Sequence, residues 1–183
     1  SFQKIEPKWQ AKWEEEGIFH AEDFSEKPKF YGLVEFPYPS GAGMHVGHIK
    51  AYSSIEVLSR KRRMQGYNVL FPIGFDAFGL PTENYAIKTN THPREITDKN
   101  IAKFSEQLKR VGFSFDWTRV IDTSRDDYYK WTQWIFLKLF EKGLVFRNKT
   151  LVNYCPSCKV VLSNEDSQGG KCDICHSDVV QLP

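Results

Sequence analysis

The chain has 183 residues, of which 40% are hydrophobic and 26% are charged, and its formal net charge is +2. This length allows one sizeable core with a small appended module, and so small a net charge does not by itself indicate nucleic-acid binding. The sequence shows no secretory signal and no apolar run long enough to span a membrane, so we expect a cytoplasmic protein with no membrane partner.

The first elements in chain order predict a strand–helix–strand unit. An amphipathic helix is expected over 4–16, where apolar residues recur every four positions from Ile5. The aromatic, apolar run 29–36 is typical of a strand, 45–65 of a helix, and a second strand begins at Tyr67. Strands joined in this way through a helix pair in parallel. The sequence therefore predicts an α/β fold.

Two further helices precede a change in sequence character. Helices are predicted over 93–111 and 124–142, and the apolar stripe of the second is expected in a core. Residues 144–154 are predicted to form a strand, and after them the chain turns to short strands, turns and cysteines. We therefore divide the chain into a larger part, 1–154, and a small module, 155–183.

A glycine-rich turn lies between the first strand and its helix, in the stretch "FPYPSGAGMHVGH" at residues 36–48. Such a turn presents free backbone N–H groups and the positive end of the helix dipole, which suits a phosphate. His45 and His48 fall in the first helical turn, where both side chains can face one ligand and donate to it. The pattern predicts a phosphate-binding site.

Other interpretations of this region are weaker. One is a plain turn with two surface histidines. Dinucleotide binding would need an acidic residue about twenty positions further on, where the chain instead carries a basic run at 60–63. That run is itself read as a solvated face, or as an RNA contact. A P-loop is excluded because its lysine motif is absent.

A second loop, "GFDAFGLPTE" at residues 74–83, follows the second parallel strand. Ligands of open α/β sheets bind at the carboxyl ends of strands, so this loop should lie beside the glycine-rich turn. Asp76 stands between Phe75 and Phe78, and a partly desolvated carboxylate suits an ammonium group. The alternative is an Asp76 that caps a helix or bonds to its own backbone.

Four cysteines form two Cys-x-x-Cys pairs near the end of the chain. The spacing is typical of a structural zinc site with four thiolate ligands, in a reducing compartment; the ligands would be Cys155, Cys158, Cys172 and Cys175. His176 could replace one of them. The run from Cys172 to His176 also fits a c-type haem attachment pattern, but the upstream pair has no role in that interpretation. We expect a zinc-ribbon-like module.

The stretches "PYPSGAGMHVGH" and "GFDAFGLPTE" together resemble the class I aminoacyl-tRNA synthetases, and among them the leucyl-tRNA synthetases. "HVGH" is similar to the HIGH signature of the family, and "YAIKTNTHP", "FDWTR" and "VNYCPSC" are similar to bacterial members. The resemblance implies that residues 1–154 are the first part of a Rossmann-like catalytic domain. It also implies a monomeric leucine–tRNA ligase that uses ATP with Mg²⁺, leucine and tRNA(Leu).

The resemblance assigns roles to residues of both motifs. Catalysis would fall to His45 and His48. ATP would be bound by Gly41, Gly43, His45, Gly47 and His48. Leucine would be bound by Phe36, Pro37, Tyr38 and Asp76.

The chain departs from the family because we find no KMSKS signature, no editing domain and no anticodon-binding part. We therefore expect a fragment that is inactive or weakly active alone. The competing hypothesis is a non-catalytic, zinc-containing module that binds nucleic acid or protein. Such a module should tolerate loss of His45 or Asp76 but not of the cysteines. A nicotinamide-dependent oxidoreductase, the third hypothesis, lacks its acidic ribose contact.

Overall fold

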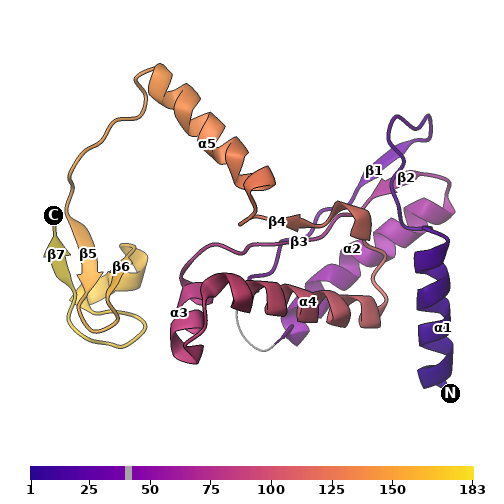
Figure 1. Ribbon diagram of the computed structural model, residues 1–183, viewed down its shortest axis with the longest axis horizontal. Coiled ribbons are helices and arrows are strands. Elements are labelled where there is room, and N and C mark those ends of the chain that lie inside the picture. Colours follow the sequence, from indigo (N-terminus) through magenta and orange to yellow (C-terminus); the bar gives the residue numbers. More distant parts are fainter. Residues whose placement is uncertain (40–42) are drawn as a thin grey trace. The chain divides into compact units, whose positions relative to one another are not determined.

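The expected strand–helix–strand unit is present in the computed structural model, which describes residues 1–39 and 43–183 (Figure 1). Strand β1 (Lys29–Tyr31) pairs in parallel with β2 (Asn68–Leu70), and helix α2 (Val46–Met64) connects them. A second parallel pair joins β3 (Gly74–Phe75) to β4 (Ile121–Asp122). The predicted α/β fold is confirmed.

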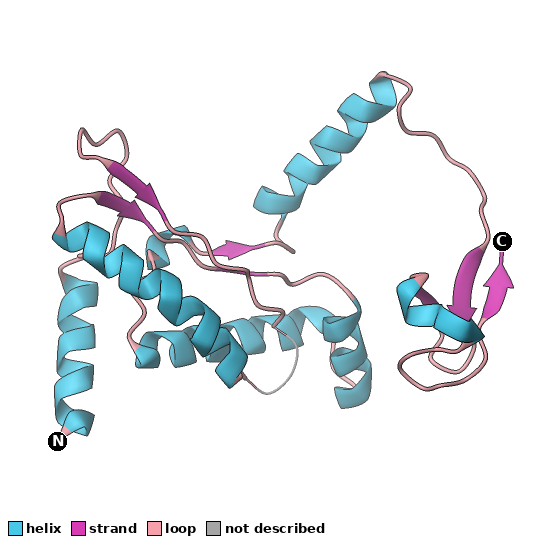
Figure 2. Ribbon diagram, turned by 180° about the vertical axis from the view of Figure 1, so that it is seen from behind, coloured by secondary structure: helices cyan, strands magenta, loops and turns pink. Residues whose placement is uncertain are grey.

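Helices account for much of the remaining chain (Figure 2). They are α1 (Phe2–Glu15), α3 (Leu80–Thr89), α4 (Pro93–Val111), the 3-10 turn η1 (Trp117–Arg119) and α5 (Asp126–Glu141). The sequence does not predict helix α3, because the stretch that contains its start is rich in glycine and proline and is typical of a loop. Its signal is the proline in the first turn, followed there by Glu83.

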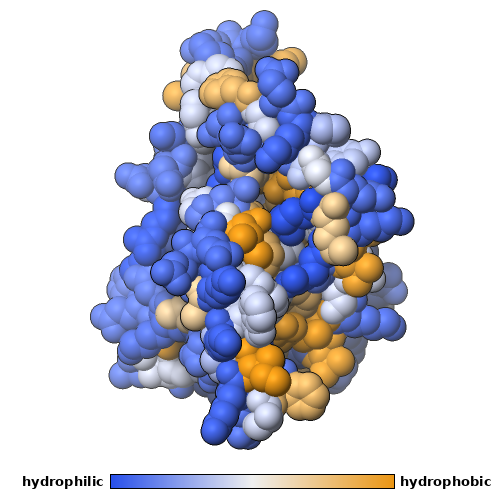
Figure 3. Space-filling model, turned by 90° about the vertical axis from the view of Figure 1, so that its right-hand side faces the viewer, coloured by the Kyte–Doolittle hydropathy of each residue, from blue (hydrophilic) through white to orange (hydrophobic). Residues whose placement is uncertain are grey.

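The chain divides into two compact units, Ser1–Gln133 and Trp134–Pro183. The core of the first unit is aromatic and lies where β2 and its continuation meet α2 and the end of α4. Its buried members are Val34, Tyr52, Val69, Phe71, Ile73, Leu108, Phe113 and Phe115. On the face that carries α1, hydrophobic side chains interrupt a largely hydrophilic surface (Figure 3). None of the described helices has the length and apolarity needed to cross a membrane.

The basic run at the end of α2 serves the fold. Arg60 contacts the buried carboxylate of Glu56, donates to the carbonyl oxygen of Gly112 at 2.6 Å, and stacks over Trp13. Arg63 donates to the Ser114 hydroxyl at 3.2 Å. Burial lowers the pKa of Arg63, the neighbouring Glu56 charge opposing that shift. The interpretation as a solvated face is therefore wrong for these two arginines.

Glu56 is the carboxylate that binds both Arg60 and Ser114, and its loss should weaken the first unit. Its Oε2 accepts from the backbone N–H of Ser114 at 2.8 Å and from the Ser114 hydroxyl at 2.9 Å. We expect Glu56→Ala to lower the free energy of unfolding by about 2–3 kcal/mol, because it leaves partly buried guanidinium groups unpaired; partial exposure of Arg60 moderates the loss.

Denaturant unfolding measures this effect. The matched control is Glu106→Ala, at an exposed glutamate of α4, which should change the free energy of unfolding by less than about 0.5 kcal/mol. Equal losses in the two variants would contradict the assignment.

The second unit contains a small antiparallel sheet of order β6-β5-β7. Its strands are β5 (Val152–Cys155), β6 (Val160–Leu162) and β7 (Val180–Leu182), with the 3-10 segment η2 (Glu165–Gly170) after β6. Only the end of the predicted strand 144–154 is a strand, because residues 144–151 pair with no other described strand. The predicted domain division at residue 155 stays a prediction.

The apolar stripe of α5 is not in a core. Residues 131–140 are all exposed, including Trp131 and Phe136. The expectation of a core position is wrong for the described chain, because no layer within it covers this helix.

Candidate active site

His45 and His48 lie together at the N-terminus of α2, as predicted. His45 is the N-cap, and its Nδ1 accepts a hydrogen bond from the backbone N–H of Gly47 at 3.1 Å. The backbone N–H of His45 in turn donates to Nδ1 of His48 at 3.3 Å. The two rings, with centroids 3.8 Å apart, thus form a capping box in which histidines replace the usual serine and glutamate.

These hydrogen bonds determine which ring nitrogen of each histidine carries the proton. An Nδ1 atom that accepts from an N–H holds no proton, so in the neutral ring the proton is on Nε2. Burial, followed by the charge of His45, lowers the pKa of His48. In this tautomer both rings offer an Nε2–H donor at the N-terminus of α2, where the helix dipole favours an anion.

The same geometry predicts a pH dependence of stability. Because the folded-state pKa of His48 lies below its unfolded value, the unfolded chain binds this proton more readily. Stability from this group is present above the unfolded pKa of about 6.5 and decreases as the pH falls through the folded pKa. In His48→Gln the side chain still caps α2 but does not titrate. We expect the wild type to lose stability relative to His48→Gln between pH 7 and pH 5, as measured by denaturant unfolding; parallel pH profiles would contradict this.

Two described glycines of this turn each leave room for a neighbouring side chain. A Cβ at Gly47 would lie 2.9 Å from Nδ1 and Cε1 of His45. A Cβ at Gly43 would lie 2.8 Å from Nε2 of Gln107. Gly41, the third glycine predicted to bind ATP, is outside the described residues. The space beside His45 exists because position 47 has no side chain.

Two cavities are lined by the extended segment 33–38. The first, of about 470 Å³, is lined by His45, Gly47 and His48 together with that segment, and we call it the histidine cavity. The second, of about 510 Å³, is lined by Asp76 together with the same segment, and we call it the aspartate cavity. Gly43 lines neither cavity. The histidine motif and the Asp76 loop thus line cavities that share the segment 33–38, which we call the wall 33–38.

The predicted amino-acid-binding residues divide between the cavities. Phe36 and Tyr38 line both, and Asp76 lines the aspartate cavity. Pro37 lines only the histidine cavity, and its carbonyl oxygen accepts from the backbone N–H of Asp76 at 3.1 Å. A Cβ at Gly74 would lie 2.5 Å from the Phe36 ring, so the glycine of the second motif lets Phe36 pack against its strand.

Asp76 is half-buried, and its carboxylate forms no hydrogen bond or ion pair with any residue that the structure describes. It neither caps a helix nor bonds to its own backbone, so this alternative is wrong. Its loop is fixed instead through Ala77, whose N–H donates to the hydroxyl of Thr123 at 2.9 Å.

The aspartate cavity is also lined by Tyr128 and Tyr129, which the sequence analysis does not identify. Their only signal in the sequence is that two adjacent tyrosines follow an acidic pair.

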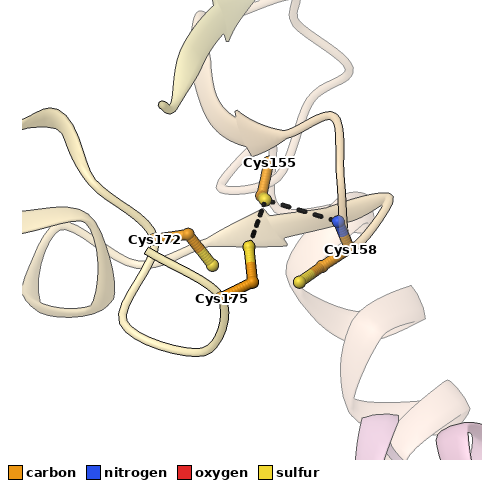
Figure 4. Close-up of side chains that lie close together, drawn as sticks. All are labelled: Cys155, Cys158, Cys172 and Cys175. Carbon is orange, nitrogen blue, oxygen red and sulfur yellow. Dashed lines mark hydrogen bonds between the residues drawn. The ribbon is translucent and has the colours of Figure 1, made fainter. Parts of the chain in front are cut away.

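The four cysteines come together in the second unit, as predicted (Figure 4). Their sulfur atoms all lie within 4.8 Å of one another, with 3.5 Å between those of Cys155 and Cys175. Tetrahedral zinc with bonds of about 2.3 Å needs sulfurs about 3.8 Å apart, so this donor set can hold a metal. His176 is not among the clustered ligand atoms.

A family model described as tRNA synthetases class I (I, L, M and V) matches residues 8–174. The chain belongs to this family. It is 58% identical over 178 residues to a protein of Alkaliphilus oremlandii (strain OhILAs) named leucine–tRNA ligase, and 54% identical over 177 residues to one of the same name from Thermotoga maritima. Each alignment covers 97% of this chain but only 22% and 21% of those proteins.

A solved structure supports the same relationship. The chain superposes with a TM-score of 0.87 and 37% identity on a crystal structure of the ternary complex of Agrobacterium radiobacter K84 agnB2 LeuRS, tRNA and LeuAMS. The match covers 97% of this chain and 23% of that one. The chain therefore spans about a fifth of the length of its relatives, and its predicted resemblance to leucyl-tRNA synthetases is confirmed.

Proposed function

We propose that this chain is part of a leucine–tRNA ligase, which activates leucine with ATP and transfers it to tRNA(Leu). The observation that carries the proposal is the pair of cavities that share the wall 33–38. One cavity presents hydrogen-bond donors at a helix N-terminus, and the other presents a carboxylate without a partner among the described residues. ATP and a free amino acid need these two kinds of site side by side.

In this mechanism ATP, with its Mg²⁺, places its phosphates against the Nε2–H donors of His45 and His48. Asp76 accepts hydrogen bonds from the ammonium group of leucine, whose side chain lies against Phe36 and Tyr38. A carboxylate oxygen of leucine attacks the α-phosphorus, and the bond from that phosphorus to the bridging oxygen breaks. Pyrophosphate leaves with the electron pair, and the histidines stabilise its developing charge. A ribose hydroxyl of tRNA then displaces AMP from the leucyl carbonyl carbon.

The same proposal assigns a structural zinc ion to the four cysteines. Four sulfur ligands fill a tetrahedral shell and leave no position for a reacting group, so the metal would hold the fold of the second unit. The free thiols suit a reducing compartment, which supports a cytoplasmic location. A monomeric state stays a prediction.

A thermal-shift titration of the full-length protein with a non-hydrolysable leucyl-adenylate analogue tests the proposed amino-acid site. At a hundred times its dissociation constant the analogue should stabilise the wild type by about 2.7 kcal/mol. We expect Asp76→Asn to bind it about a hundredfold more weakly, because the neutral amide does not replace a carboxylate that pairs with a buried ammonium.

Isoleucyl and methionyl analogues are the specificity controls, and Glu106→Gln, at an exposed carboxylate of α4, is the control variant. A preference for either control ligand would overturn the leucine assignment. Equal binding by Asp76→Asn and the wild type would remove Asp76 from the site. If the cysteine variants lost function while the His45 and Asp76 variants kept it, the non-catalytic binding module would be favoured.

A further inference from the structure

Helix α4 contacts the glycine-rich turn on both sides. Nδ2 of Asn100 donates to the carbonyl oxygen of Pro39 at 2.7 Å, and Oε1 of Gln107 accepts from the backbone N–H of Met44 at 2.8 Å. The two side chains are two helical turns apart, which places them on the same face of α4 about 10 Å from each other. Pro39 and Met44 flank the turn, and Met44 directly precedes the N-cap His45.

These contacts are closely packed. Asn100 is 7% exposed, and Pro39 is among the fully buried residues. The Gln107 amide lies against the open face of Gly43, where a Cβ would approach its Nε2 to 2.8 Å. A side chain at position 43 would therefore push Gln107 away from Met44. The absence of a side chain at Gly43 serves this contact, since Gly43 lines neither cavity.

Helix α4 is a rigid support for such contacts. Phe104 and Leu108, on turns between and beside the two amides, are 1% and 0% exposed in the first unit. The His45 ring, in contrast, is exposed at the end of α2 and is held by hydrogen bonds within its own turn. Those local bonds fix the ring relative to α2, and α2 is joined to the wall 33–38 by the Tyr52 hydroxyl, which donates to the carbonyl oxygen of Glu35 at 2.8 Å. The contacts of Asn100 and Gln107 act at the other end of the connection, on Pro39 and Met44.

We propose that Asn100 and Gln107 are positioning residues that hold Pro39 and Met44 so that the Nε2–H groups of His45 and His48 face the histidine cavity. The inference rests on the proposed function, because it concerns the site that would take the ATP phosphates. It predicts that loss of the Gln107 contact impairs the use of ATP while leaving leucine binding unchanged. Neither amide touches a substrate in this assignment.

The chemistry of the Gln107 contact allows a sharp test. Gln107 acts through its acceptor oxygen, so Gln107→Met removes the acceptor at similar length. The double variant Glu106→Gln/Gln107→Glu keeps an acceptor at position 107 and keeps the charge of the helix unchanged. Glu106 is exposed, so its replacement by glutamine offsets the added charge at position 107 without changing a buried contact. A bystander role of Gln107 would not distinguish the two variants.

The experiment is leucine-dependent ATP–pyrophosphate exchange in the full-length protein. We expect Gln107→Met to lower kcat/KM for ATP about tenfold, with KM for leucine within twofold of wild type and thermal stability unchanged. The double variant should stay within twofold of wild type in every parameter. Asn100→Leu should show the same loss for ATP. Wild-type kinetics in Gln107→Met, or equal impairment in the double variant, would overturn the proposal.

Amide hydrogen exchange separates this inference from the proposed function. If the wild type showed no leucine-dependent exchange of pyrophosphate, the proposed function would fail. The rate of amide hydrogen exchange at the Met44 N–H would then test the positioning role of Gln107 by itself. Faster exchange in Gln107→Met but not in the double variant would support the positioning role. Equal exchange in both variants would overturn it.

Discussion

Removal of the metal from the cysteine cluster is expected to unfold the three-stranded sheet of the second unit while the first unit stays folded. Apart from two of the cysteines, the buried core of this sheet contains only Val160 and Leu162. So small a core does not stabilise a fold of this length without a further constraint. Structural zinc supplies about 10 kcal/mol or more in comparable small sites, which exceeds what these two aliphatic side chains contribute.

Metal analysis should find one zinc ion per chain. Hydrogen exchange read over residues 150–183 before and after a strong chelator then measures the unfolding. Cys155→Ser and Cys172→Ser, at the two buried ligands, should show the unfolded pattern without chelator. Ser157→Ala, at an exposed position of the same turn, is the control and should match the wild type. Protection that survives the chelator would show that the sheet does not depend on a metal.

Replacement of either histidine of the capping box is expected to abolish most of the ATP-dependent activity without unfolding the protein. Each Nε2–H is a preorganised donor to charge that develops on the phosphates, and loss of one such donor lowers kcat by about a hundredfold to a thousandfold. Asparagine at position 45 and glutamine at position 48 retain the N-cap and capping-box roles. His45→Asn and His48→Gln therefore separate activity from helix stability.

Leucine-dependent pyrophosphate exchange and thermal unfolding of the full-length protein measure the two effects. The chain offers a matched control, because His92 caps α4 in the same manner, its Nδ1 accepting from the backbone N–H of Arg94 at 3.2 Å. His92→Asn should retain wild-type activity. Activity within threefold of wild type in both active-site variants would remove the histidines from the mechanism.

The parts of the site that sequence could predict are those encoded in short stretches. The zinc-type spacing of the cysteines, the parallel strands around α2, and the presence of His45 and His48 in one helical turn all follow from local pattern. The hydrogen bonds of the two histidines with backbone N–H groups could not be predicted from sequence, because histidine is an unusual member of a capping box. The tautomers, and with them the donors, became visible only in the structure.

The missed features depend on contacts between distant segments. Gln107 and Met44 are separated by 63 positions, and no local pattern marks an amide on a helix as the partner of a turn. Arg60 looked like a surface charge, yet the carbonyl oxygen to which it donates is 52 positions away. The apolar stripe of α5 was expected in a core but is exposed. Periodicity predicts that a helix has an apolar face, but it does not show which other element covers that face.

Gly47 keeps open the space that the His45 ring needs at the start of α2. It lies in the first turn of α2, where alanine would favour the helix by up to about 1 kcal/mol. The added methyl group would occupy the space of the His45 ring. A redesign guided by helix propensity alone would choose alanine here, which would displace a proposed catalytic side chain and break its N-cap hydrogen bond to position 47. Any engineering of this protein for heat resistance should keep position 47 fixed and seek its gains elsewhere.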